Sequence, residues 1–257
     1  MNPGIATALA CGLALVGRAL GWLTVAGAAA AAAVGTAVFA GGGPAAAVLL
    51  ACFFVSGSLL TRLSHARGRR DRLDLQSGGR GARQVLANGS WAAIGALLVP
   101  VWDGGWPLLV GALAAAQADT WATEVGAFWP APPRLISTGR QVAPGTSGGI
   151  TPGGTAGGAA GAAALAALGG VAGLSWTVLA ASLAGGIVGM MLDSLLGATV
   201  QASYYCESCS TTAEKRSHRC GRTLALTRGW GWFDNDVVNL VATGSGGIAA
   251  FLLWAVL

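Results

Sequence analysis

The chain has 257 residues, of which 54% are hydrophobic and only 10% are charged, and it contains 42 glycines. A soluble globular domain carries about 25% charged residues, so this composition excludes an ordinary soluble enzyme or binding domain. It predicts an all-α fold, a polytopic bundle of transmembrane helices. Residues 1–257 are expected to form a single integral membrane domain within a lipid bilayer.

Eight apolar segments are candidate spans. In chain order they lie near residues 3–17, 20–40, 44–63, 84–101, 106–128, 153–172, 175–201 and 234–256. The first is shorter than the 20 or so residues that a span needs. The sequence therefore predicts about eight spans, or seven if the first is partial.

The positions of the basic residues predict the orientation of these spans. All 15 lysines and arginines lie in alternate connections. By the positive-inside rule, those connections face the cytoplasm and both termini face the opposite side. The net charge of +5 then reflects topology. Nucleic-acid binding is not expected, because the arginines lie at span ends without interleaved aromatic residues.

The fifth segment is interrupted by the polar sequence ADTWATEVG at residues 118–126. Ionisable groups within a span are costly and mark functional sites. Asp119 follows Trp106 by about 13 residues, or about 20 Å, which places it in the cytoplasmic half of the span. The same topology brings other polar residues to that half, namely Glu124, Asp193, Asp234, Asp236, Asn88, Asn235 and Asn239.

Five carboxylates around one cavity would repel one another, and a divalent cation would relieve that repulsion. Carboxylate and amide oxygens suit Mg²⁺, which is commonly shared with substrate phosphates. We therefore expect Asp119, Glu124, Asp193, Asp234 and Asp236 to include Mg²⁺ ligands. Thr123 shares a helical face with Asp119. Glu124 diverges from that face by about 140°, which makes Asp119 the better ligand and leaves Glu124 to position Arg134 or Arg140. The alternative is interhelical hydrogen bonding or a proton relay.

Residues 129–152 are predicted to form a cytoplasmic phosphate-binding loop. Small residues let backbone N–H groups converge on an anion, and the next helix presents its N-terminus to the same place. The expected phosphate ligands are Arg134, Ser137, Thr138, Arg140, Gly145, Thr146, Ser147, Gly148, Gly149 and Thr151, with Ser194 from the seventh segment. Arg140 is also expected to act in catalysis. The alternative is a flexible linker. The chain has no P-loop motif.

Residues 202–233 form a second cytoplasmic loop, rich in cysteine. Cys206, Cys209, His218 and Cys220 offer four soft ligands, compatible with a small structural Zn²⁺ site. The alternative is a set of free thiols. The reducing cytoplasmic side argues against a disulfide.

Four motifs follow one another in a characteristic order. They are ADTWATEVG (118–126), PRLISTGR with PGTSGGIT (133–140 and 144–151), DSLLGA (193–198) and NDVVN (235–239). Together they resemble the membrane family that contains transmembrane protein nineteen and the plant chloroplast phytyl-phosphate kinase, from about Leu23 onward. The resemblance implies a multi-helix membrane protein. For the plant members it implies transfer of a phosphoryl group from a nucleoside triphosphate to an isoprenyl monophosphate.

The expected function is therefore Mg²⁺-dependent phosphoryl transfer from CTP or ATP to a phytyl or polyprenyl monophosphate at the cytoplasmic face, giving the diphosphate. Two alternatives remain, namely CTP-dependent nucleotidyl transfer to a lipid phosphate and a lipid-phosphate transporter or flippase. A transporter is expected to have an inverted repeat and polar residues across the membrane, and neither is evident here. The sequence is compatible with an oligomer.

Overall fold

The computed structural model describes residues 2–66, 79–209, 211–214, 216, 220 and 223–257. Its helices are α1 (Pro3–Ala19), α2 (Val25–Ala66), α3 (Ala82–Leu98), α4 (Gly105–Gly126), α5 (Pro152–Val171), α6 (Trp176–Thr199) and α7 (Asn235–Trp254). Within the described residues, four of them (α2, α5, α6 and α7) are long and apolar enough to cross a membrane. The predicted helical membrane protein is confirmed, but eight spans are not.

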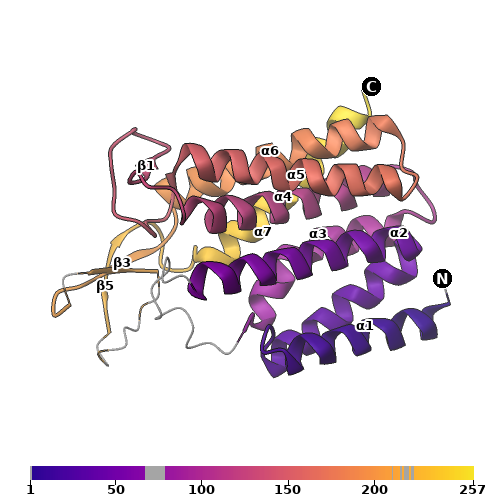
Figure 1. Cartoon of the computed structure of the whole chain (residues 1–257), viewed down its shortest axis with the longest axis horizontal. Coiled ribbons are helices and arrows are strands. Elements are labelled where there is room, and N and C mark those ends of the chain that lie inside the picture. The colour runs from indigo at the N-terminus through magenta and orange to yellow at the C-terminus, as the bar shows by residue number, and fades with distance from the viewer. Residues whose placement is uncertain (1, 67–78, 210, 215, 217–219, 221–222) are drawn as a thin grey trace.

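Helix α2 contains both the second and the third predicted segments. Its Gly43 has φ 63° and ψ −157°, which is not helical, and Pro44 follows. A straight helix of 42 residues would be about 63 Å long. Yet the guanidinium of Arg62 lies 5.4 Å from the ring centroid of Trp22. The chain therefore reverses at Gly43, so that the two arms of α2 run antiparallel, as Figure 1 shows.

The connections between helices alternate between the two ends of the bundle. Figure 1 shows the N- and C-termini at one end and the strands at the other. The connections that contain the strands follow α4 and α6. This arrangement agrees with the alternation of basic and uncharged connections in the sequence, and the strand-bearing end is called the inner end below.

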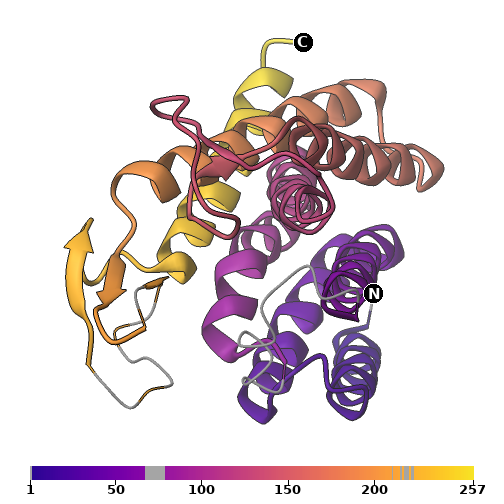
Figure 2. The ribbon, with the colours of Figure 1, turned by 60° about the vertical axis from the view of Figure 1, so that its left-hand side comes forward.

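The all-α prediction is wrong in the connections, where the structure has two small sheets. Strands β1 (Arg134–Leu135) and β2 (Gly149–Ile150) pair antiparallel. Strands β3 (Ser203–Cys206), β4 (Thr211–Ala213) and β5 (Ala225–Arg228) form an antiparallel sheet in the order β4-β3-β5. The strands have only two to four residues, too few for a clear alternating pattern in the sequence. In Figure 2 the three-stranded sheet and α1 lie on opposite sides of the bundle.

Helix α4 is the central helix of the bundle. It contacts α2, α3, α5, α6 and α7, and every residue from Pro107 to Ala118 is buried. A helix that is apolar on all sides is suited to such an enclosed position. Even Gln117 is buried, and its Nε2 donates to the Gly161 carbonyl of α5 at 2.8 Å.

Glycines allow the helices around α4 to approach closely. At one junction Gly111 of α4, Gly185 of α6 and Gly246 of α7 meet, and a Cβ added to Gly185 would collide with the Gly246 carbonyl. Small residues at helix crossings give membrane helices their van der Waals packing. These glycines therefore serve helix packing.

Replacing Gly185 by alanine should loosen the junction of α6 and α7. Overpacking of this kind costs about 1–3 kcal/mol, so we expect a lower Tm for Gly185→Ala in detergent. Gly12→Ala is the matched control, because a Cβ on Gly12 of α1 meets nothing within 4 Å. That control should match or exceed the wild-type Tm. Equal Tm values for the two variants would contradict the packing described here.

Candidate functional site

A cavity of about 3080 Å³ opens at the inner end of the bundle, where α4 ends. Its lining includes most of the polar residues that the sequence singled out. They are Asn88, Asp119, Thr123, Glu124, Gly145–Gly149, Thr151, Asp193, Ser194, Asp234, Asn235, Asp236 and Asn239. The cavity also extends between apolar side chains of α1 and α2, among them Leu13, Phe39 and Phe53. It thus combines a polar inner end with an apolar extension.

Two carboxyl groups meet in this cavity, Asp119 on α4 and Asp193 on α6. They lie within hydrogen-bonding distance of each other, and the charge of Glu214 also acts on Asp193. Among the described residues, Oδ2 of Asp193 is buried and has no hydrogen-bond partner. Two carboxylates this close require a shared proton or a cation. The pair, with one oxygen left over, fits Mg²⁺, whose preferred protein ligands are carboxylate oxygens.

Glu124 faces α2. It is 3% exposed and accepts hydrogen bonds from Thr61 Oγ1 at 2.8 Å and from Ser64 Oγ. It also interacts electrostatically with Arg80, where burial lowers the pKa of the guanidinium and Glu124 opposes that shift. The predicted divergence of Glu124 from Asp119 is therefore seen, and its polar partners include two hydroxyl groups of α2.

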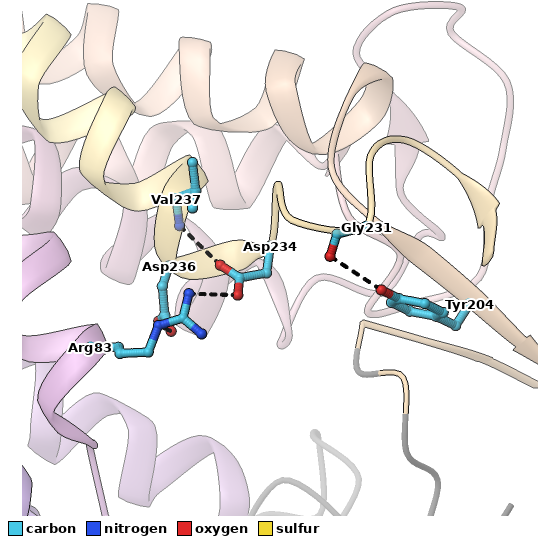
Figure 3. Close-up of polar contacts among 6 residues, drawn as sticks. All are labelled: Arg83, Tyr204, Gly231, Asp234, Asp236 and Val237. Atoms are coloured by element: carbon cyan, nitrogen blue, oxygen red, sulfur yellow. Dashed lines mark hydrogen bonds and ion pairs between the residues drawn. The ribbon is translucent and has the colours of Figure 1, made fainter. Parts of the chain in front are cut away.

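Asp234 and Asp236 form a third acidic group at the start of α7 (Figure 3). Asp234 Oδ1 caps the helix by accepting from Val237 N at 3.2 Å, and its Oδ2 lies 2.7 Å from Arg83 Nη2. Asp236 Oδ2 lies 3.5 Å from Arg83 Nε. The Arg83 side chain is 68% exposed, so these ion pairs are weak.

The five predicted metal ligands therefore line one cavity but form three separate groups. Within the described part of the chain, no three of these carboxylates bring their oxygens within 4.8 Å of one another. The closest approach to a metal site among them is the Asp119–Asp193 pair, which α4 and α6 hold together. The rotation of each helix about its axis decides this division.

The loop between α4 and α5 is held against the end of α6. Gly148 has φ 79°, and a side chain there would run into the backbone of Ala198. The loop hydroxyls have protein partners. Thr146 Oγ1 donates to the Ala143 carbonyl at 2.7 Å and Ser147 Oγ to Glu214 Oε1 at 2.6 Å. Thr151 Oγ1 caps α5 by accepting from Gly154 N at 3.0 Å.

Four predicted phosphate ligands do not reach the cavity lining. They are Arg134, Ser137, Thr138 and Arg140. The turn after β1 directs this segment outward, where Arg134 Nη1 donates to the Gly139 carbonyl at 2.9 Å and Arg140 N to Thr138 Oγ1 at 3.4 Å. The expectation that Glu124 positions either arginine has no support in this arrangement.

Other arginines line the cavity instead, and sequence reasoning missed them as site residues. They are Arg62, Arg80, Arg83, Arg216 and Arg228. Arg228 of β5 donates from Nη1 to the Ala198 carbonyl at 3.1 Å and from Nη2 to the Gly197 carbonyl at 2.7 Å, where a cation also suits the C-terminal end of α6. The one available signal was position, because Arg80 and Arg83 lie just before the uncharged predicted span 84–101.

The predicted zinc ligands Cys206, Cys209 and Cys220 converge in the connection between α6 and α7. His218, the fourth predicted ligand, lies outside the described residues.

Comparison with known proteins identifies the family. The profile of the integral membrane protein DUF92 family matches residues 8–247. The chain belongs to this family. Protein PGR of Arabidopsis thaliana is 30% identical over 223 residues, covering 75% of this chain and 76% of the relative. An uncharacterized membrane protein of Methanocaldococcus jannaschii is 29% identical over 210 residues, covering 81% and 76%. No solved structure matches this DUF92 protein.

Limited proteolysis tests whether the α4–α5 loop packs against the end of α6. Gly148→Ala should detach the loop, because it introduces both a strained φ and a collision with Ala198. Trypsin should then cut faster after the exposed Arg134 and Arg140. Gly145→Ala is the control, since Gly145 has φ 83° but open space around its Cβ position. Equal cleavage rates for the two variants would show that Gly148 does not anchor the loop.

Proposed function

We propose that this protein transfers a phosphoryl group from a nucleoside triphosphate, CTP or ATP, to an isoprenyl monophosphate of the phytyl or polyprenyl class. The reaction is Mg²⁺-dependent and takes place at the inner, cytoplasmic end of the bundle. The observation that carries the proposal is the Asp119–Asp193 pair, with its unpartnered oxygen, at the polar end of a cavity that continues between apolar helices.

The cavity supplies both kinds of surface that such a reaction needs. Its apolar extension along α1 and α2 suits a prenyl chain, and Arg80, Arg83 and Arg228 are positioned to neutralise phosphate charge. Asp119 and Asp193 would hold Mg²⁺, which supplies charge neutralisation for the phosphate oxygens. The family resemblance of the four sequence motifs supports the same reaction.

The chemistry places few demands on the protein. An oxygen of the lipid monophosphate attacks the γ-phosphorus, the bond to the β-phosphate oxygen breaks, and the nucleoside diphosphate leaves. In phosphoryl transfer the protein mainly positions the reactants and stabilises charge. No strong base is required, because the acceptor is already an anionic phosphate oxygen.

The decisive assay uses purified protein with Mg²⁺, geranylgeranyl or phytyl monophosphate, and CTP or ATP labelled at the γ-phosphate. We expect label in the lipid diphosphate. A parallel reaction with α-labelled nucleotide detects a nucleotide-capped lipid, which would overturn the kinase proposal in favour of nucleotidyl transfer. Absence of turnover with both nucleotides and both lipids would overturn both, and leave transport as the surviving alternative.

Asp119→Asn should lower turnover about 100-fold or more, as loss of an electrostatic stabiliser of a transition state does. Asp103→Asn is the matched control, because Asp103 lies at the opposite end of α4 beside Trp106. It should keep wild-type turnover. Size-exclusion profiles and Tm values establish that both variants fold. Undiminished turnover in folded Asp119→Asn would refute the metal role of Asp119.

A further inference from the structure

Three cysteines meet in the connection between α6 and α7, away from the carboxylate pair. Cys206 ends β3, Cys209 lies in the turn before β4, and Cys220 lies between β4 and β5. Their sulfur atoms all lie within 4.8 Å of one another, and those of Cys206 and Cys220 are 3.6 Å apart. Cys206 is 1% exposed, whereas the other two are exposed.

These distances match the edges of a tetrahedral zinc–thiolate site. With Zn–S bonds of about 2.3 Å, tetrahedral geometry places neighbouring sulfurs about 3.8 Å apart. A disulfide would use two of the thiols and leave the third without a reason to converge. Metal binding requires thiolates, which a bound Zn²⁺ would stabilise.

The sheet that carries the cysteines has too small a core to hold itself together. Its buried core is Ala202, Tyr204, Cys206 and Leu224, with Ala213 packed against it. Small units of this size depend on added crosslinks such as metals. Two further hydrogen bonds stay within the same connection, from Ala202 N to the Phe233 carbonyl at 2.9 Å and from Tyr204 OH to the Gly231 carbonyl at 3.4 Å, the latter drawn in Figure 3.

We propose that Cys206, Cys209 and Cys220 bind one structural Zn²⁺ that fastens the β4-β3-β5 sheet. The three thiolates carry the proposal. His218, the fourth ligand expected from the sequence, lies outside the described residues, so the proposal assigns three of the four ligands that a structural zinc takes.

The zinc site would order residues that border the large cavity. Glu214, directly after β4, accepts the hydrogen bond from Ser147 of the α4–α5 loop. Arg228, on β5, binds the last carbonyls of α6. The sheet therefore connects the Zn²⁺ to both segments that dock on the end of α6. The proposal stands whether or not phosphoryl transfer is the function, because metal content is measured without any substrate.

Metal analysis tests the proposal directly. Protein purified under reducing conditions and dialysed against metal-free buffer should contain about one zinc per chain, measured by inductively coupled plasma mass spectrometry. Cys206→Ser and Cys220→Ser should lose most of it. Cys11→Ser and Cys52→Ser are the matched controls, because these cysteines lie in α1 and α2, and both should retain it.

A second measurement avoids reliance on variants that fail to fold. Wild-type protein stripped of zinc and loaded with Co²⁺ should show the visible and near-ultraviolet bands of tetrahedral thiolate coordination. The proposal would be overturned if the purified wild-type protein contained no zinc and its Co²⁺-loaded form showed no such bands. A disulfide would also overturn it. In that case Cys206 and Cys220 would resist alkylation until the protein is treated with a reductant.

Discussion

The enclosure of α4 is the constraint on which the rest of the structure depends. Five helices surround it, so a polar group on α4 can reach neither lipid headgroups nor bulk water along most of its length. An unpaired buried carboxylate costs several kcal/mol or changes its protonation. Each acid at the inner end of α4 must therefore find a partner on a neighbouring helix. Glu124 finds hydroxyl groups on α2, and Asp119 finds Asp193 on α6.

Glu124 and Asp119 have different kinds of partner. The difference distinguishes a structural role for Glu124 from the functional role proposed for Asp119. Hydroxyl donors satisfy a carboxylate and tie two helices together, which is a sufficient reason for Glu124 to be where it is. A second carboxylate does the opposite, since it adds repulsion. Close packing of Gly186 and Gly189 of α6 against Ala114 and Ala115 of α4 holds the two helices at a separation that maintains the Asp119–Asp193 pair. The Mg²⁺ proposed above would offset this repulsion.

The C-terminal end of α6 organises the inner surface around that pair. Gly148 packs on Ala198 from one connection, and Arg228 binds Gly197 and Ala198 from the other. The hydrogen bond from Ser147 to Glu214 joins the two connections directly. Helix α6 thus carries Asp193 and, one turn later, the residues Gly197 and Ala198 that contact the α4–α5 loop and β5.

The sequence predicts which residues gather at the inner end, because alternating basic connections set the direction of every helix. It does not predict how each helix is rotated, since α4 is apolar on all sides and shows no preferred face. For that reason the division of the acids into three groups, and the pairing of Arg83 with Asp234, emerge only in three dimensions.

Other features were beyond sequence reasoning for local reasons. The strands are too short to produce a periodic pattern, whereas the reversal at Gly43 falls between the segments 20–40 and 44–63 that the sequence separates. In the sequence, proximity to glycines favours Arg134 and Arg140 as phosphate ligands. The cavity is instead lined by Arg80 and Arg228, whose side chains reach it from neighbouring elements.

The most direct test of this account is Mn²⁺ binding followed by electron paramagnetic resonance, in the absence of nucleotide and lipid. Zinc-loaded wild-type protein should bind about one Mn²⁺ that Mg²⁺ displaces. Asp193→Asn should weaken binding about tenfold or more, whereas Asp236→Asn should leave it unchanged. Equal losses in the two variants, or no Mn²⁺ bound by the wild-type protein, would contradict a cation site at the Asp119–Asp193 pair.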